Sequence, residues 1–347
     1  MLKQKAPMRK KTATAVEKEK CSSSFFLSQV SLLQSRKKWG LIFALATVTG
    51  ILCTNPAIFI MGIFDASQRG QEGEVVVWIF VSKLILLPLA TFLTIVGMYV
   101  LNDLFDVDID RANGKKRPIP LRQVSKNQVW IFVALTNAIG FAIALFTYSL
   151  PNILIFMSLV AIGLMYSSPK VSLKDRLVIK TLSISIALML SLLFGLTGIY
   201  KWTSDGKYLD VLAVPLYAAL MLGIMIFVTS PLNDLGDING DREAGRRTIP
   251  IVIGKKRTLK LSVFFSSTMI ALSWILYGYS TSKIGIIIPL LTSLHATITI
   301  LSLGKMLANL DNMDFVRRFV LRKSMPLHIL LQLLLIMGAL LSKMVIG

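Results

Sequence analysis

Residues 102–120 read NDLFDVDIDRANGKKRPIP, and residues 233–250 read NDLGDINGDREAGRRTIP. Both segments begin with Asn-Asp-Leu, and one gap aligns an Asp-Arg pair, a glycine, two basic residues and an Ile-Pro pair. Each segment follows a long apolar run, and four such runs separate the two. Because an even number of membrane crossings returns the chain to the same side, both segments would lie on one membrane face. We interpret them as two copies of a parallel internal repeat.

The composition of the chain is that of an integral membrane protein. Hydrophobic residues make up 54% of the 347 residues and charged residues only 16%, whereas about a quarter of a soluble domain is charged. A membrane-spanning helix needs about 20 mostly apolar residues. The sequence has nine such runs, at 39–64, 75–101, 128–148, 152–167, 178–200, 210–232, 259–279, 284–304 and 326–346. We predict an all-α fold of about nine transmembrane helices, a 4+4+1 bundle in which a four-helix unit occurs twice.

Basic residues are distributed unevenly along the chain. There are 38 Lys and Arg against 18 Asp and Glu, an excess that can attract nucleic acid but that also sets topology beside apolar runs. Residues 1–38 and the loops after the second, fourth, sixth and eighth runs hold 32 of the 38. The positive-inside rule places the amino terminus and these loops in the cytoplasm. We expect a multi-pass protein of the plasma or inner membrane, without a nucleic-acid partner and with a site cavity facing the cytoplasm.

The amino-terminal segment differs from the rest of the chain. Residues 1–24 are rich in Lys, Ser and Thr and contain no apolar core, so they do not have the pattern of a signal peptide. We predict residues 1–35 as a disordered, basic cytoplasmic tail that contacts membrane lipids, with a weak signal for an interfacial helix at Phe25–Leu33. Residues 36–347 form the membrane domain.

Cysteine and histidine are scarce. The two cysteines, Cys21 and Cys53, lie in different kinds of segment and suit neither a disulfide framework nor a zinc site. The two histidines, His295 and His328, lie in apolar runs. We expect both histidines to be packing residues rather than bases.

Oxygen ligands recur at helical spacing in both segments. The residues spaced four apart are Asn102, Asp106 and Asp110 in the first segment and Asn233, Asp237 and Asp241 in the second. Residues four apart share one helix face, and Asp103 and Asp234 widen these faces. A single Asp near a helix end is usually a cap or a solvated loop residue. The same spacing in two repeats favours a functional cluster in each.

Facing carboxylate clusters repel each other unless cations lie between them. Oxygen ligands without His or Cys favour Mg²⁺, here two or more ions with Mn²⁺ as a substitute. Basic residues next to the clusters would meet the anion that these metals bridge. They are Lys115, Lys116, Arg117, Arg246 and Arg247. Together these features indicate a diphosphate site, and its membrane setting indicates a lipid diphosphate.

The motifs NDLFDVDID at 102–110 and DLGDINGD at 234–241 resemble those of the UbiA superfamily of intramembrane prenyltransferases. That family carries an NDxxDxxxD motif and a DxxxD or DxxDxxxD motif on nine transmembrane helices. The Arg117-Pro118 pair and the pattern Tyr166-Ser167…Pro169…Leu173-Lys174 add to the resemblance, which spans about residues 36–346. One departure is that Arg36 is not followed by proline, whereas family members often open the first helix with Arg-Pro.

The resemblance implies roles for individual residues. The metal ligands would be Asn102, Asp106, Asp110, Asp234, Asp237 and Asp241. The donor diphosphate would be contacted by Lys116, Arg117 and Arg246. The catalytic set would be Asp103, Asp106, Asp237, Lys174 and Tyr166, with Lys174 and Tyr166 also gripping the diphosphate. Asp103 would support the ligands or act as a base, and Phe105 or Tyr166 would stabilise an allylic cation.

The resemblance leaves the acceptor open. The second motif resembles the branch that contains digeranylgeranylglyceryl phosphate synthases, chlorophyll synthases and homogentisate prenyltransferases. The acceptor is therefore either geranylgeranylglyceryl phosphate or an aromatic quinone or porphyrin-type precursor, and a geranylgeranyl-length polyprenyl diphosphate is the favoured donor. A UbiA-type terpene cyclase is an alternative. A cation-coupled transporter is a further one, although the carboxylates lie at helix ends beside basic residues and not at mid-bilayer.

Overall fold

The computed structural model describes residues 25–54, 70–112, 114–199, 208–243, 245–280 and 284–346. These residues form nine helices that are long and apolar enough to cross a membrane. They are α2 (Phe25–Thr54), α4 (Gly70–Phe105), α6 (Lys126–Leu145), α7 (Leu150–Ser167), α8 (Leu177–Ile199), α9 (Tyr208–Gly236), α12 (Lys255–Tyr279), α13 (Ile287–Leu307) and α14 (Met313–Ile346). The prediction of an all-α membrane fold with about nine spans is confirmed.

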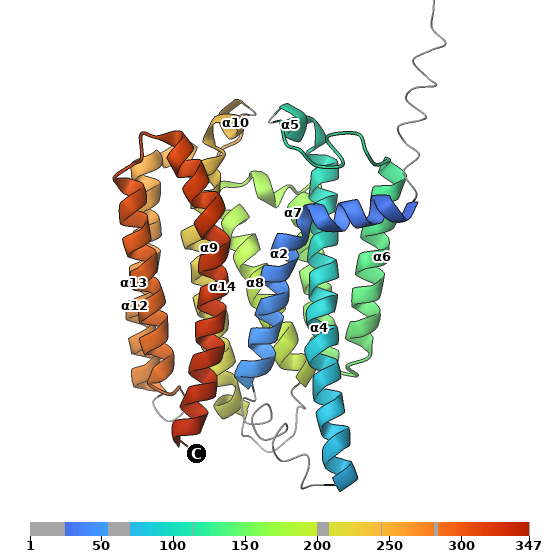
Figure 1. The fold of residues 1–347 in the computed structure, drawn as a ribbon, viewed down its shortest axis with the longest axis vertical. Helices are drawn as coiled ribbons and strands as arrows, with labels where there is room; N and C mark the ends of the chain where they lie inside the picture. The colour runs from blue at the N-terminus through green and yellow to red at the C-terminus, as the bar shows by residue number, and fades with distance from the viewer. Residues whose placement is uncertain are drawn as a thin grey trace, which may run out of the picture.

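Short helices gather at one end of the bundle. They are α5 (Val107–Ala112), the 3₁₀ turn η1 (Leu173–Asp175), α10 (Ile238–Glu243) and α11 (Ile249–Ile253). Figure 1 shows α5 and α10 side by side at this end, α5 above α4 and α10 above α9. The two motif segments therefore share one face of the bundle, as a parallel repeat requires.

The two repeats meet where α2 packs against α8. A Cβ added to Gly50 would lie 2.0 Å from the carbonyl oxygen of Leu192, and one added to Gly195 would lie 2.1 Å from that of Thr47. Leu192 lies three residues before Gly195, and Thr47 lies three residues before Gly50. Each glycine therefore contacts the backbone one helical turn before the other glycine, and the contact is reciprocal. Small residues allow this close approach between membrane helices. Since α2 opens the first repeat and α8 the second, the contact relates equivalent helices of the two halves.

The amino-terminal prediction needs a correction. Residues 25–35, expected in a disordered tail, form the first part of α2, while residues 1–24 lie outside the described residues. Figure 1 shows this part of the helix running across α4 and α6, a little below their upper ends, before α2 turns into the bundle. Leu32 is fully buried, and Gln128 Nε2 donates a hydrogen bond to Ser28 Oγ over 3.1 Å. The apolar sequence FFLSQVSLL supplies this contact and favours a helix lying at the membrane interface.

Several helices are longer than the apolar runs predicted. Helix α4 extends the run at 75–101 to 70–105, and α14 extends the run at 326–346 to 313–346. Pro326 lies inside α14 without ending it, which bundles tolerate where neighbouring groups satisfy the freed carbonyl. Residues 55–64 of the first predicted run lie outside the described residues.

Candidate functional site

Both motif segments interrupt their helix at the central aspartate. Helix α4 ends at Phe105 and α5 begins at Val107, while α9 ends at Gly236 and α10 begins at Ile238. The single continuous helix face predicted from the four-residue spacing is therefore wrong. Residues four apart are nevertheless still joined by helical backbone hydrogen bonds. The Asp110 amide donates to Asp106 O over 2.8 Å, and the Asp241 amide donates to Asp237 O over 3.0 Å.

The turn that follows each short helix is the same in both repeats. Gly114 and Gly245 have φ values of 61° and 68°, the left-handed conformation that ends many helices. The next amide turns back in each case: Lys115 N donates to Asp110 O and Arg246 N to Asp241 O, both over 2.9 Å. Lys115 and Arg246 are therefore structurally equivalent residues.

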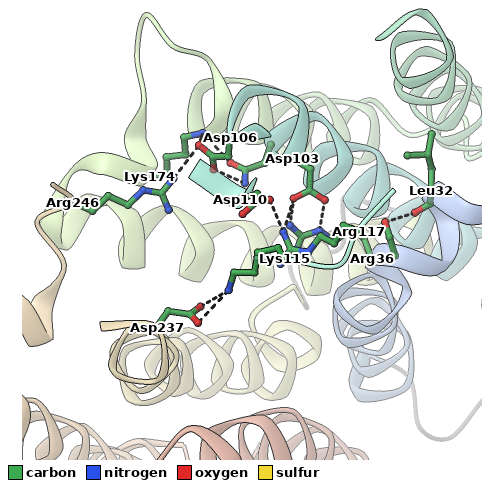
Figure 2. Close-up of polar contacts among 12 residues, drawn as sticks. Leu32, Arg36, Asp103, Asp106, Asp110, Lys115, Arg117, Lys174, Asp237 and Arg246 are labelled. Atoms are coloured by element: carbon green, nitrogen blue, oxygen red, sulfur yellow. Dashed lines mark hydrogen bonds and ion pairs between the residues drawn. The ribbon is translucent and has the colours of Figure 1, made fainter. Parts of the chain in front are cut away.

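Lys115 and Arg246 form ion pairs across the repeats. Lys115 Nζ lies 3.2 Å from both carboxylate oxygens of Asp237. In the opposite direction, Arg246 Nη2 lies 2.9 Å from Asp106 Oδ1. Each repeat thus supplies the cation for the central aspartate of the other (Figure 2). The fold brings the two clusters together in this way.

Asp106 in the first cluster is paired with two cations. Besides Arg246, Lys174 Nζ donates to it over 2.8 Å, and Asn102 Nδ2 donates to its second oxygen over 3.1 Å. Burial acts to raise the pKa of Asp106, but the hydrogen bond from Lys174 and the charge of Arg246 outweigh it and hold the pKa below its ordinary value. Asp106 is therefore a carboxylate at neutral pH.

Asp103 is enclosed by two arginines. Its exposed fraction is 1%, and Arg36 donates to both carboxylate oxygens, with Nε 2.8 Å from Oδ2. Arg117 Nη1 donates to Asp103 Oδ1 and to Asp110 Oδ2, each over 2.9 Å. With both oxygens occupied by cations, Asp103 is placed to position arginines and not to accept a proton. The arrangement does not fit the base role that the resemblance allowed for Asp103.

Two carboxylates of the second cluster, Asp237 and Asp241, are held more loosely than Asp106. Asp234 is closely paired, with Lys180 Nζ 2.5 Å away, but the ion pair that Asp241 forms with the described residues is to Arg246 Nη1 at 3.8 Å. Burial raises the pKa of Asp241 above its ordinary value, and it does the same for Asp110 in the first cluster. The Asp237 side chain is 49% exposed, against 9% for Asp106.

Three cavities meet at Tyr166. A polar pocket of about 70 Å³ is lined by Asn102, Asp106, Tyr166, Lys174, Asp175, Lys180, Arg246, Arg247 and Thr248. An apolar channel of about 50 Å³ runs from Tyr166 and Asn102 along Met98, Ile162 and Ala187 into the bundle. A third cavity, of about 400 Å³, includes Tyr99, Tyr166, Asp234 and Asp237 in its wall. Five basic residues line this third cavity, namely Arg36, Lys115, Arg117, Lys180 and Arg317.

Lys116 and Phe105 lie away from this junction, and Asp103, Asp110 and Asp241 do not line its cavities either. Lys116 is exposed and is absent from the walls of all three cavities, because the turn at Gly114 directs its neighbour Lys115 inward instead. Phe105 is 38% exposed and packs edge-on against Trp130 with ring centroids 6.2 Å apart. Of the two aromatic residues proposed to face an allylic cation, Tyr166 alone lines the cavities.

Three basic residues that line the site were not among the predicted site residues, namely Arg36, Lys180 and Arg317. Arg36 is buried three residues before the first predicted run, and the signal at this position was the missing proline after it. Lys180 lies inside the run at 178–200, and a lysine within an apolar run was the available signal.

The donor set fits a hard divalent cation. Within the described ranges no three His, Cys, Asp or Glu residues form a ready-made metal group. Mg²⁺, however, binds through one or two carboxylates together with water and substrate phosphate oxygens, and the clusters supply such carboxylates. In addition, Arg246 Nε is buried and has no partner in the described part of the chain, so it can still donate to an anion.

Comparisons with known proteins agree with the geometry. A sequence profile of the UbiA prenyltransferase family matches residues 72–320. The digeranylgeranylglyceryl phosphate synthase of Pyrococcus abyssi is 26% identical over 195 residues, which cover 56% of this chain and 65% of that protein. The match thus spans slightly less than two thirds of the relative's length.

Solved structures share the fold. A chain from a structural study of digeranylgeranylglyceryl phosphate synthase in membranes superposes with a TM-score of 0.62 at 19% identity, covering 92% of this chain and 99% of that one. A UbiA homologue from Archaeoglobus fulgidus bound to GPP and Mg²⁺ gives a TM-score of 0.60 at 17% identity, covering 91% and 99%.

Proposed function

The chain belongs to the UbiA prenyltransferase family, and from this premise we propose that it transfers a polyprenyl group from its diphosphate to a lipid acceptor in the membrane. The observation that carries the proposal is the junction at Tyr166, where a cationic pocket, an apolar channel and a larger cavity meet. A bound donor would place its diphosphate in the cationic pocket and its prenyl group in the apolar channel. The acceptor would occupy the larger cavity.

The donor diphosphate fits the polar pocket. Lys174, Arg246 and Arg247 line it and supply charge-assisted hydrogen bonds to phosphate oxygens. The C1 end of the prenyl chain would enter the apolar channel, which opens at Tyr166 between α4, α7 and α8. The reacting carbon would then lie beside the Tyr166 ring, whose face can stabilise an allylic cation.

Mg²⁺ would be held by the carboxylates of both clusters together with the diphosphate. The proposed ligands are Asn102, Asp106, Asp110, Asp234, Asp237 and Asp241. When bound, the metal supplies Lewis-acid stabilisation of the leaving diphosphate. Lys115 and Arg246, which neutralise Asp237 and Asp106 in the structure, are then free to donate to phosphate oxygens. Arg36 and Arg117, fixed by Asp103, face the larger cavity.

A phosphate-bearing acceptor fits this cavity best. Five basic residues line it, and Arg317 forms no ion pair with any described residue. We propose geranylgeranyl diphosphate as donor and geranylgeranylglyceryl phosphate as acceptor, in agreement with the name of the Pyrococcus relative. A separate acceptor cavity argues against a terpene cyclase, which quenches its cation internally.

The reaction can be tested with purified protein in lipid nanodiscs. Labelled geranylgeranyl diphosphate is supplied with geranylgeranylglyceryl phosphate or with an aromatic quinone precursor such as homogentisate. We expect the label to join the glyceryl phosphate lipid in Mg²⁺ or Mn²⁺ and not in excess EDTA. Transfer to the aromatic acceptor alone would overturn the choice of acceptor, and full turnover in EDTA would overturn the metal-dependent mechanism.

We propose that the end of the bundle bearing α5 and α10 faces the cytoplasm, because the amino-terminal segment and the loops at this end hold 32 of the 38 basic residues. In a protein with Cys21 and Cys53 replaced by serine, Lys116→Cys and Glu243→Cys should react with an impermeant thiol reagent only in inside-out vesicles. Tyr148, 91% exposed on the loop between α6 and α7, should react as Tyr148→Cys only from the outside. The reverse pattern would overturn the orientation.

A further inference from the structure

A row of buried polar side chains runs along one face of α14. Ser324, His328 and Gln332 are spaced four residues apart, and all three are buried. Each has an atom without a hydrogen-bond partner in the described part of the chain: Ser324 Oγ, His328 Nδ1 and Gln332 Oε1. Burying polar side chains inside a membrane bundle costs free energy, and such residues usually mark functional sites. This row therefore calls for an explanation beyond packing.

The hydrogen bonds around His328 favour one tautomer of its ring. The Thr229 hydroxyl lies 3.0 Å from the Met225 carbonyl oxygen, to which it can donate, and Thr229 Oγ1 lies 2.8 Å from His328 Nε2. With the hydroxyl hydrogen directed to Met225, Thr229 accepts from Nε2, which then carries the proton of the neutral ring. Nδ1 keeps an unshared electron pair and has no donor facing it among the described residues.

His328 lines the larger cavity, on the acceptor side of the Tyr166 junction. Two carboxylates in the same wall are paired, Asp234 with Lys180 and Asp237 with Lys115. His328 belongs to the same wall, and its Nδ1, which is covered by protein atoms, has no hydrogen-bond partner in the described part of the chain. An unpaired buried acceptor also favours an O–H donor as its missing partner.

Building on the proposed function, we propose that His328 is the catalytic base that removes the proton from an alcohol-type acceptor. The acceptor oxygen forms a bond to C1 of the prenyl group, and the bond from C1 to the diphosphate oxygen breaks with its electron pair leaving on the diphosphate. The hydroxyl proton moves to His328 Nδ1. The resulting imidazolium keeps its Nε2–H bond to Thr229.

The chain offers a matched control in His295. It is buried on α13, its Nε2 donates to the Leu327 carbonyl oxygen over 2.9 Å, and its Nδ1 is also without a partner in the described residues. His295 does not line any of the three cavities that meet at Tyr166. His295→Gln therefore reports what losing a buried, half-satisfied imidazole does to the fold alone.

The experiment compares wild type, His328→Gln and His295→Gln in two assays. The first is transfer of geranylgeranyl to geranylgeranylglyceryl phosphate. The second is the rise in Tm on adding Mg²⁺ with a non-ionising thio-analogue of the donor. We expect His328→Gln to lower kcat about 10²-fold or more, in the range of general-base catalysis, with an unchanged Tm rise. His295→Gln should remain within about threefold of wild type, the residual effect of imperfect packing.

Rescue gives an independent result. Imidazole added to His328→Ala should restore part of the transfer rate, because it can occupy the vacated space and accept the proton. A His328→Gln rate near wild type would overturn the proposal, as would loss of both the rate and the Tm rise, which indicates a structural role. Absence of transfer by wild type would instead overturn the proposed function, so the two failures are distinguishable.

Discussion

The two motif segments share one backbone design and differ in how they hold their carboxylates. Both end in a left-handed glycine that aims a basic residue at the opposite repeat. Asp106 is 9% exposed and pairs with Lys174 and Arg246, whereas Asp237 is 49% exposed and pairs with Lys115. The first segment is a closed, prearranged cluster, and the second opens onto the larger cavity. The two segments thus keep the same backbone geometry in different environments.

The largest effect should separate the two central aspartates. We expect Asp106→Asn to lower kcat about 10³-fold and Asp237→Asn about 10²-fold, the range seen when one preorganised electrostatic partner is removed. The neutral amide at 106 leaves Lys174 and Arg246 without their shared carboxylate, while solvent compensates at 237. Steady-state kinetics of variants that purify normally would measure this. Equal losses at both positions would show that the segments contribute equally.

The crossed ion pairs should rank in the same order. Arg246→Ala removes the guanidinium that pairs with the buried Asp106 in the polar pocket, and we expect a loss of about 10²-fold in kcat/KM. Lys115→Ala removes the ion pair with Asp237, which is half-exposed to solvent and therefore contributes little free energy. We expect a loss of about 5-fold in kcat/KM. The control is Lys116→Ala, because Lys116 is exposed beside Lys115 and should leave kcat/KM unchanged. A larger loss from Lys115→Ala than from Arg246→Ala contradicts the comparison.

The contact between α2 and α8 should show symmetry where the motif segments do not. Gly50→Ala and Gly195→Ala each press a methyl group into a backbone carbonyl of the other helix. We expect similar destabilisation from each, about 1–3 kcal/mol, as in overpacked cores, seen as a lower Tm in detergent. Gly278→Ala on α12 has no atom within 4 Å of the added Cβ and serves as control. Unequal effects would refute the reciprocal contact.

The smallest effect concerns the pH dependence of stability without added metal. Because the pKa of Asp106 is lowered in the fold, its stabilisation is complete above the unfolded value of about 3.9 and is lost as pH falls through the folded pKa. The raised pKa of Asp241 affects stability in the opposite direction. Its ionised form destabilises the fold at neutral pH, and this cost disappears as pH falls through the raised pKa. Asp106→Asn should therefore reduce the fall in Tm below about pH 4.

The matched variant in the second segment is Asp241→Asn. In wild type, protonation of Asp241 should raise Tm as pH is lowered from neutral, and Asp241→Asn should abolish this rise. The fall in Tm at lower pH, which depends on Asp106, should remain. Thermal unfolding of both variants followed over the same pH series measures both slopes. Identical curves for the two would mean that burial, and not pairing, dominates at Asp106 as well.

Periodicity and repetition made much of this architecture predictable. Apolar runs gave the nine spans because each must cross the same bilayer thickness, and the duplicated Asn-Asp-Leu segments placed both clusters at one end. The local sequence also contains the amphipathic start of α2. It was assigned to the tail because Lys-rich residues precede it and dominate the composition.

Contacts between distant segments were not predictable in the same way. Which of Lys115 and Lys116 faces the site depends on the turn at Gly114, which the basic pair itself does not reveal. Arg36 reaches Asp103 across 67 positions in the sequence, and no periodic pattern encodes that pairing. His328 was expected to be a packing residue. Its contact with Thr229, and the hydrogen bond between Thr229 and Met225, depend on how α9 and α14 pack together and cannot be read from the sequence.

The ion pairs also imply an order of assembly during synthesis. Asp103 finds Arg36 and Arg117 within the first repeat, so this buried charge can be neutralised as soon as the first two spans leave the insertion machinery. Asp106 can pair with Lys174 once the fourth span has emerged, but Lys115 must wait for Asp237, and Asp106 for its second partner Arg246, both of which follow the sixth span. Chains fold in the order in which they are made. The nascent first half therefore carries an unfinished charged surface, whose completion by the second half coincides with formation of the donor pocket.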